Sequence, residues 1–187
     1  VIEDFQPDYV FVHGDTTTSM AGSIASFYSG AKVCHVEAGL RTHNKLSPFP
    51  EEINRQIAGR VCDYHFAPTE TSKQNLLQEN VKESTILVTG NTVIDALLES
   101  VKRVKKKPSF HIQELSKTLK DNEMILVTGH RRENHGDGFV RICEALKIIA
   151  LDCTNRLIVY PVHLNPMVQE PVKRILKDVD NVILIDP

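Results

Sequence analysis

The sequence contains no long apolar run. No stretch of its 187 residues approaches the ~20 consecutive apolar side chains that a membrane-spanning helix needs. No segment has the layout of a signal peptide, with a basic start, an apolar centre and small residues at a cleavage site. We therefore expect no association with a membrane.

An excess of positive charge is also absent. The chain has 22 Lys and Arg against 24 Asp and Glu, a formal net charge of −2 and a pI near 6.5. Proteins that bind nucleic acid through its phosphates are usually basic, so we expect no nucleic-acid partner. The net figure hides a division, because residues 1–100 carry 7 basic and 13 acidic side chains, whereas residues 101–187 carry 15 and 11. This division indicates two chemically different lobes.

Short-spaced cysteine pairs are missing too. Cys34, Cys62, Cys143 and Cys153 are scattered, and none belongs to a C-x-x-C motif. Cys34 and Cys143 lie among apolar residues, where a buried and inert thiol is the expected state. We expect neither a disulfide nor a cysteine-bound metal, and this cysteine usage predicts a cytoplasmic location.

Short β-rich runs alternate with helical stretches along the chain. Most runs are continuous Val, Ile, Leu, Phe or Tyr, as in strands buried on both faces of a parallel sheet. The predicted strands are residues 9–13, 32–37, 64–67, 85–88, 124–128, 157–161 and 182–185. The predicted helices are residues 19–29, 51–61, 69–79, 91–104, 138–150 and 171–177. This repetition predicts an α/β fold with a doubly wound architecture.

The boundary between the lobes is predicted after the helix at residues 91–104. Thr92 and Asp95 begin this helix in a pattern similar to a capping box, and its apolar side chains share one face. Three lysines and Pro108 then close it, which is typical of a solvated helix end. We place the boundary at residues 105–112.

Polar residues gather where the first two predicted strands end. Ligands of open parallel sheets bind outside the carboxyl ends of the strands. Alternation along a strand puts His13 and Asp15 on one face, and His35 and Glu37 on one face of the next strand. Taken alone, the first of these ends is better explained by a capped strand–helix turn around Gly14. Two His-x-acid pairs can bind a metal, but single-residue spacing is weak evidence, and we predict no metal.

A third acidic element begins the helix expected at residues 51–61. Pro50 followed by Glu51 and Glu52 is a typical helix start, because the helix dipole stabilises carboxylates there. Glu51 and Arg55 are four residues apart and share a face, so a charged group can be presented to a ligand.

The second lobe carries basic strand ends. The strand at residues 124–128 is followed by Gly129, His130, Arg131 and Arg132, a combination that suits a diphosphate. A basic surface turn is the alternative. The strand at residues 157–161 is followed by His163, which is a ligand contact or a structural histidine.

Five motifs in one order resemble those of the non-hydrolysing UDP-N-acetylglucosamine 2-epimerases, and the similarity runs through all 187 residues. The motifs are His-Gly-Asp-Thr-Thr (13–17), His-Val-Glu-Ala-Gly-Leu-Arg (35–41), Pro-Phe-Pro-Glu-Glu-Ile-Asn-Arg (48–55), Gly-His-Arg-Arg-Glu-Asn (129–134) and Pro-Val-His-Leu-Asn-Pro (161–166).

The resemblance implies an isomerase that interconverts UDP-GlcNAc and UDP-ManNAc. The family eliminates UDP to give 2-acetamidoglucal and adds it back on the opposite face, which supplies ManNAc for cell-surface polysaccharide. Neither NAD nor a metal is implied, and a homodimer is. The implied acid/base residues are Asp15, Glu37, Glu51 and His130. The implied contacts to the nucleotide, or to the sugar and diphosphate, are Arg131, His163 and Arg55.

The resemblance also implies two Rossmann-like lobes of the GT-B type, both incomplete. Residues 1–104 would be the C-terminal part of the first lobe with a connecting helix, 105–112 a linker, and 113–187 the N-terminal part of the second, nucleotide-binding lobe. The family's early Gly-Thr-Arg-Pro-Glu segment is absent, so we expect a fragment that is inactive alone. The alternatives are a GT-B glycosyltransferase, a hydrolysing relative and a non-catalytic nucleotide-sugar-binding fragment.

Overall fold

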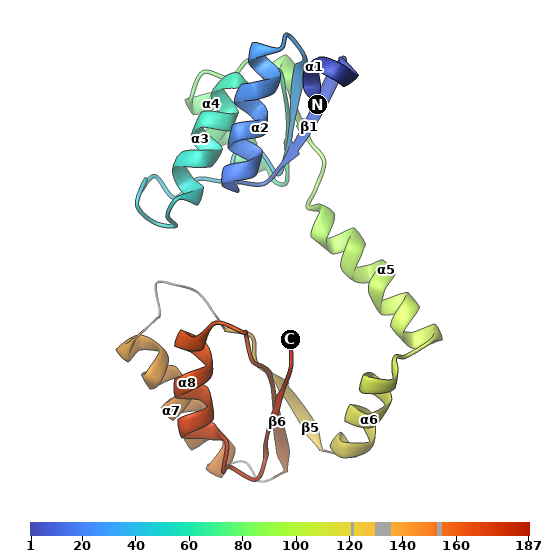
Figure 1. The fold of residues 1–187 in the computed structure, drawn as a ribbon, viewed down its shortest axis with the longest axis vertical. Helices are drawn as coiled ribbons and strands as arrows, with labels where there is room; N and C mark the ends of the chain where they lie inside the picture. Colours follow the sequence, from blue (N-terminus) through green and yellow to red (C-terminus); the bar gives the residue numbers. More distant parts are fainter. Residues whose placement is uncertain (121, 130–135, 153–154) are drawn as a thin grey trace. The chain divides into compact units, whose positions relative to one another are not determined.

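The computed structural model describes residues 1–120, 122–129, 136–152 and 155–187 (Figure 1). The chain divides into two units, Val1–Lys105 and Lys106–Pro187. The first unit contains α1 (Ile2–Phe5), β1 (Tyr9–His13), α2 (Thr17–Tyr28), β2 (Lys32–Val36), α3 (Glu51–Val61), β3 (Tyr64–Ala67), α4 (Glu70–Gln78), a 3₁₀ turn (Glu83–Thr85) and β4 (Ile86–Val88). It also contains α5 (Thr92–Lys106) except for the last residue of that helix, with which the second unit begins. The second contains α6 (Phe110–Leu119), β5 (Glu123–Leu126), α7 (Asp137–Asp152), β6 (Arg156–Pro161), α8 (Pro166–Leu176) and β7 (Val182–Ile185).

The sheet of the first unit is parallel and runs in the order β1-β2-β3-β4. Because right-handed crossovers that move in one direction leave their helices on one face, α2, α3 and α4 lie together on the same side of this sheet (Figure 1). Val33, His35, His65 and Ala67 are buried on the strands. The predicted α/β fold with parallel strands is confirmed.

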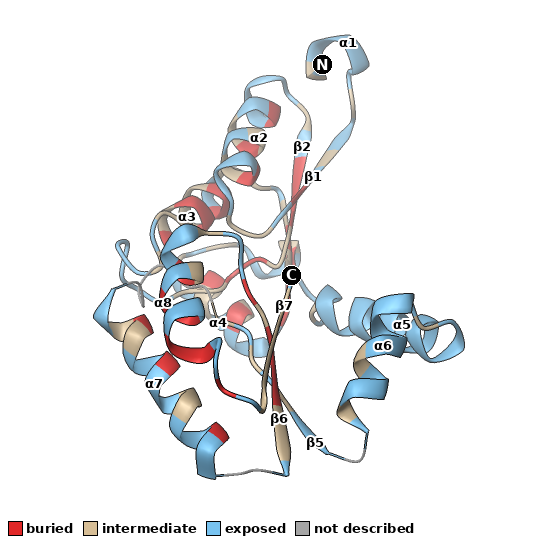
Figure 2. Ribbon diagram, turned by 60° about the horizontal axis from the view of Figure 1, so that its bottom comes forward, coloured by how far each residue is buried: buried red, intermediate tan, exposed pale blue. Residues whose placement is uncertain are grey.

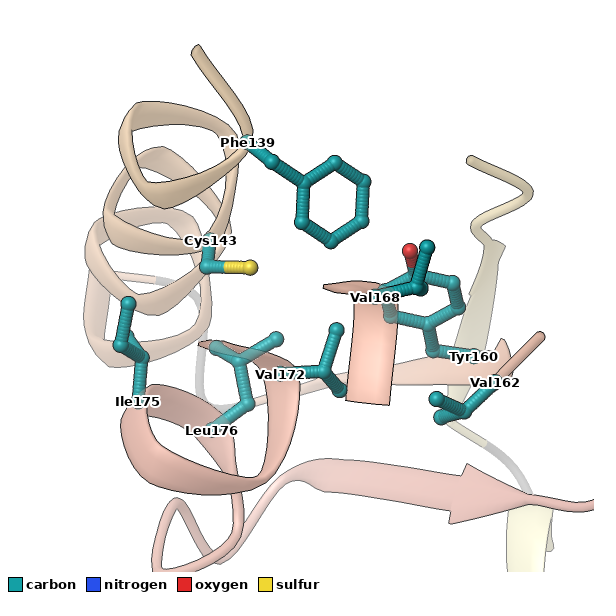
Figure 3. Packing of buried hydrophobic residues seen from close by; sticks show 8 residues of the cluster. All are labelled: Phe139, Cys143, Tyr160, Val162, Val168, Val172, Ile175 and Leu176. Atoms are coloured by element: carbon teal, nitrogen blue, oxygen red, sulfur yellow. The ribbon is translucent and has the colours of Figure 1, made fainter. Parts of the chain in front are cut away.

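The second unit repeats this arrangement with three parallel strands in the order β5-β6-β7. Its core joins α7, α8 and the end of β6 (Figure 3). The buried members of this cluster are Phe139, Cys143, Tyr160, Val162, Val168, Val172, Ile175 and Leu176. Neither sheet, among the strands described, contains the reversal of strand order that a doubly wound sheet requires.

Two helices depart from the sequence-based prediction. The helix α6 begins after Ser109, whose side chain caps it, although the sequence pattern predicted a linker at residues 105–112 and no helix before the strand at residues 124–128. The helix α8 begins at Pro166 rather than at Pro171, because the Asn165 side chain caps the helix and Pro166 occupies its first turn. Pro171 therefore lies inside the helix and does not start it.

The helix predicted at residues 91–104 is confirmed as α5, but its apolar face is not buried in this chain (Figure 2). Its exposed apolar side chains are Val93, Ile94, Leu97, Leu98, Val101 and Val104. Among the described residues, no helix is both long enough and apolar enough to cross a bilayer.

Candidate active site

The turn between β1 and α2 carries the first predicted site residue, Asp15. Gly14 has a φ of +70°, a left-handed conformation that glycine adopts without strain. Its N–H donates to the Val36 carbonyl at 3.0 Å, which continues the pairing of β1 with β2 into the turn. The Thr16 side chain then caps α2 by accepting from the Ser19 N–H at 3.1 Å. The capped turn expected from the sequence is therefore present.

Glu37 follows β2 in a strained conformation. Its φ of +67° is uncommon for a residue with a Cβ, and such strain is concentrated at functional sites. A Cβ built on Gly14 would lie 3.4 Å from Glu37 Oε2, and His13 Nε2 lies 3.9 Å from the same oxygen. The turn thus brings the Glu37 carboxylate beside the end of β1.

The pairing of these side chains differs from the one predicted. Alternation along a strand would have grouped His13 with Asp15, but β1 ends at His13 and β2 ends at Val36, so the rule does not extend to either carboxylate. His13 faces Glu37 across the strands, whereas Asp15 faces Arg55 of α3.

The carboxylate of Asp15 is held by Arg55. Arg55 Nη2 donates to Asp15 Oδ2 at 2.6 Å, and the Arg55 side chain is 10% exposed. Asn54, the preceding residue, donates from Nδ2 to the Asp15 carbonyl at 2.9 Å. The structure therefore brings together two residues that the sequence singled out separately, and it adds Asn54, which sequence reasoning missed.

The two carboxylates that begin α3, those of Glu51 and Glu52, lie in different environments. Glu51 is the half-buried first residue of the helix, while Glu52 is fully buried. Glu52 accepts from the Thr42 and His43 N–H groups at 3.0 and 3.2 Å and lies 3.5 Å from Arg55 Nη1. Burial raises the pKa of Glu52, but these hydrogen bonds and Arg55 outweigh it, so the pKa lies below its usual value. Arg55 thus pairs with Asp15 and Glu52, whereas the sequence spacing indicated only that Glu51 and Arg55 share a face of the helix.

Glu52 anchors the loop that follows Glu37, a role not predicted from the sequence. One signal was available, because Glu52, Arg55 and Gln56 share one face of α3. Gln56 Nε2 donates to Glu52 Oε1 at 2.9 Å. A buried carboxylate needs such partners, and here they fix the loop to the helix.

The site residues of the second unit are only partly described. His130 and Arg131 lie outside the described residues. Gly129 precedes them, and its carbonyl accepts from Tyr160 Oη at 2.9 Å. Tyr160 is fully buried, and this burial raises the pKa of its hydroxyl to about 12. The backbone entering the predicted diphosphate-binding segment is therefore tied to the core.

His163 is exposed between β6 and α8. Its Nδ1 accepts from the N–H of Asn165 at 3.1 Å, and Asn165 Oδ1 accepts from the Met167 N–H at 3.0 Å to cap α8. A ring whose Nδ1 accepts a hydrogen bond carries its proton on Nε2 in the neutral form. His163 thus lies next to a capped helix N-terminus.

In the part of the chain that the structure describes, no group of three His, Cys, Asp or Glu side chains is arranged to hold a metal ion. The three described cysteines, Cys34, Cys62 and Cys143, are free. Burial raises the pKa of the Cys62 thiol to about 12 and that of Cys143 to about 11, so both are inert structural thiols near neutral pH.

Two buried histidines make stability depend on pH. Burial lowers the pKa of His35 from 6.5 to about 4, and it also lowers the pKa of His65, its register neighbour on β3. The unfolded chain therefore binds protons that the folded chain does not, and stability falls as pH drops from 6.5 towards 4. We expect the free energy of unfolding to decrease by about 3 kcal/mol over this range through His35.

Urea denaturation at a series of pH values measures this effect. His35→Gln removes the titrating ring and is expected to flatten the decrease between pH 6.5 and 4. His111→Gln, a replacement of an exposed histidine on α6, serves as the matched control and is expected to leave the decrease intact. An unchanged pH dependence in His35→Gln would contradict the assignment.

The fold and these strand ends define a parallel α/β protein with a cluster of polar and charged side chains at the carboxyl edge of its first sheet. A sequence profile described as UDP-N-acetylglucosamine 2-epimerase matches residues 1–187. The chain belongs to the UDP-N-acetylglucosamine 2-epimerase family, and the resemblance of its motifs is confirmed.

The relatives are about twice as long as this chain. The UDP-N-acetylglucosamine 2-epimerase of Yersinia pestis is 56% identical over 190 residues, which cover 100% of the chain and 50% of that protein. The crystal structure of the Neisseria meningitidis UDP-GlcNAc 2-epimerase bound to UDP-GlcNAc superposes with a TM-score of 0.91 at 46% identity, covering 100% of the chain and 51% of that structure. The Methanocaldococcus jannaschii enzyme in complex with UDP-GlcNAc and UDP has a TM-score of 0.78 at 32% identity, with 100% and 51% coverage. The chain thus matches about half of a GT-B-like epimerase.

Proposed function

We propose that the full-length protein containing this chain interconverts UDP-GlcNAc and UDP-ManNAc by inverting carbon 2 of the sugar. The observation that carries the proposal is the arrangement at the end of the first sheet, where Asp15 is fixed by Arg55 and Glu37 lies beside the same turn. Membership of the epimerase family, and the UDP-GlcNAc bound in the Neisseria relative, support the substrate.

The reaction would proceed by elimination and re-addition. A base removes the proton from carbon 2 as the bond between carbon 1 and the UDP oxygen breaks, which gives 2-acetamidoglucal and UDP. UDP then adds back to carbon 1, and carbon 2 receives a proton on its opposite face. Because the carbon 2 proton is not acidic, its removal needs a positioned base coupled to departure of the diphosphate. Asp15, Glu37, Glu51 and His130 are the candidates for the base and the acid.

Departure of UDP creates negative charge that cationic groups would stabilise. We assign this role to Arg131 and His163, with Arg55 near the sugar and the diphosphate. In the neutral ring of His163 the proton lies on Nε2, because Nδ1 accepts from the Asn165 N–H.

The alternatives make different use of the carboxylates. A non-catalytic module has no use for several acids beside an anionic diphosphate, because they repel the ligand. A glycosyltransferase or a hydrolysing relative would cleave the sugar–phosphate bond without exchanging the proton on carbon 2.

Exchange of that proton provides the test. We expect the full-length protein, incubated with UDP-GlcNAc in D₂O, to form UDP-ManNAc and to place deuterium at carbon 2, as followed by proton NMR and mass spectrometry. The substrate in D₂O without protein is the control. Turnover without deuterium at carbon 2 would contradict the elimination mechanism and favour transfer or hydrolysis.

We further propose a cytoplasmic homodimer that needs neither NAD nor a metal and that supplies ManNAc units for cell-surface polysaccharide. The absence of short-spaced cysteine pairs supports a reducing compartment. The family resemblance supports the dimer and the polysaccharide role.

A further inference from the structure

Three consecutive backbone carbonyls in the β1–α2 turn each accept a hydrogen bond from a side chain. Ser19 Oγ donates to the His13 carbonyl at 2.6 Å. His35 Nε2 is 2.8 Å from the Gly14 carbonyl, and Asn54 Nδ2 donates to the Asp15 carbonyl at 2.9 Å. The three donors come from α2, β2 and α3, so three separate elements hold one turn.

This turn has more hydrogen bonds than its local conformation requires. The Thr16 cap already completes the start of α2, and glycine at position 14 already permits the left-handed backbone. The donors from His35 and Asn54 reach across 21 and 39 residues of sequence. Both side chains are buried, with 0% and 3% exposure, so each polar group has been withdrawn from water to contact this turn.

The contact also fixes the protonation pattern of the His35 ring. A carbonyl only accepts hydrogen bonds, so Nε2 carries the proton that reaches Gly14. His35 Nδ1 is buried without a partner among the described residues. In a neutral ring Nδ1 is only an unused acceptor, whereas in a protonated ring it would be a buried N–H donor without an acceptor, which is costly. His35 therefore acts as a neutral donor to the turn.

We propose that His35 and Asn54 are positioning residues that hold the His13–Gly14–Asp15 turn so that the Asp15 carboxylate meets the substrate in one geometry. The effect on turnover rests on the proposed function, whereas the effect on the turn does not. Neither residue needs to touch the substrate. A displacement of about 1 Å at a reacting group can lower a rate by ~10²-fold, so a loosened turn is costly.

The neighbouring strand offers a matched control. His65 pairs in register with His35, is also buried, and has Nε2 3.1 Å from the Gly59 carbonyl with Nδ1 unpartnered among the described residues. Gly59 lies within α3 and not in the turn. His65 thus reproduces the burial and hydrogen bonding of His35 at a carbonyl remote in sequence from Asp15.

The experiment compares His35→Leu, His35→Gln and His65→Leu in the full-length protein, with kcat and KM for UDP-GlcNAc and the urea midpoint measured for each. We expect His35→Leu to lower kcat by ~10²-fold with little change in KM. His35→Gln is expected to restore most of this loss, because its amide can donate to the Gly14 carbonyl. His65→Leu is expected to lower the urea midpoint similarly while kcat stays within ~3-fold of wild type. Equal losses of kcat in the two Leu variants, or no rescue by Gln, would overturn the proposal.

A second readout does not depend on activity. We expect ¹⁵N NMR of the imidazole nitrogens to show His35 as the Nε2–H tautomer, and His35→Leu to shift the amide resonances of Gly14 and Asp15 where His65→Leu does not. The Nδ1–H tautomer, or unmoved turn resonances, would overturn the proposal even in an active enzyme. If these signals behave as expected in a protein that forms no UDP-ManNAc, the proposed function fails and the positioning role stands.

If His35→Leu does not fold, Asn54→Ala replaces it. This truncation removes one donor to the turn and leaves space for water, and we expect a ~10-fold decrease in kcat with KM nearly unchanged. Wild-type kcat in Asn54→Ala would overturn the role of Asn54.

Discussion

The Asp15→Asn variant of the full-length protein is expected to lose turnover by about 10³-fold and to remain folded, because general acid–base groups contribute 10²–10⁴-fold. Asn has nearly the shape of Asp and can still accept the hydrogen bond from Arg55 Nη2, which is now 2.6 Å from the carboxylate. The Asp15 carbonyl keeps its bond from Asn54, since the backbone is unchanged. What the variant loses is the ability to exchange a proton.

The measurement is kcat for UDP-ManNAc formation, together with the urea midpoint of each variant. Glu83→Gln is the matched control, because it also removes one carboxylate from an ion pair, the 2.8 Å contact with Lys73. Glu83 lies in the 3₁₀ turn before β4 and not after the carboxyl end of a strand. Its kcat should equal that of the wild type. Comparable losses are expected for Glu37→Gln and His130→Gln. Near-normal turnover by Asp15→Asn would remove Asp15 from the acid/base assignment.

The sheet was predictable from the sequence because its strands carry a strong local signal. The run Val10–Phe11–Val12, and Val33 and Cys34 of β2, place apolar side chains on both faces of their strands. Runs of this kind are too short for a helix and rich in β-branched and aromatic residues, so they predict strands of a parallel sheet. The helix α8 was misplaced for an equally local reason. Proline is common at the start of a helix, which favoured Pro171, but the side chain of Asn165 six residues earlier caps the helix and places its start at Pro166.

The arrangement within the site was harder to predict because its partners are far apart in the sequence. Asp15 meets Arg55 across 40 residues, and His35 meets Gly14 across 21. Side chains alternate between the two faces of a sheet only while the strand continues. Glu37 follows β2 with a positive φ, so this alternation does not predict the direction of its side chain. The residue types at the strand ends thus indicated where the site lies. Which side chains pair within it depends on how α3 packs against the β1–α2 turn, and the sequence alone does not give that packing.

A glycine close to this site is expected to be the most sensitive backbone position. Gly39 has a φ of +86°, and a Cβ placed on it would lie 2.2 Å from the Ser72 carbonyl oxygen and 2.8 Å from the Ser72 carbonyl carbon. Those atoms belong to the backbone of α4, which Asn75 holds in place by donating to the Gly39 carbonyl at 2.9 Å. Neither partner of the clash can move as a flexible side chain would.

We therefore expect Gly39→Ala to lower the free energy of unfolding by about 4 kcal/mol, through backbone strain of about 1–3 kcal/mol and overpacking of similar size. Gly30→Ala separates the two causes, because Gly30 has a similar φ of +79° but no atom within 4 Å of the added Cβ. It should cost only the strain, about 1–2 kcal/mol. Urea denaturation of both variants at pH 7 gives the difference. Equal destabilisation would mean that α4 moves away from the new methyl group, and that the contact between Gly39 and Ser72 does not constrain the loop following Glu37.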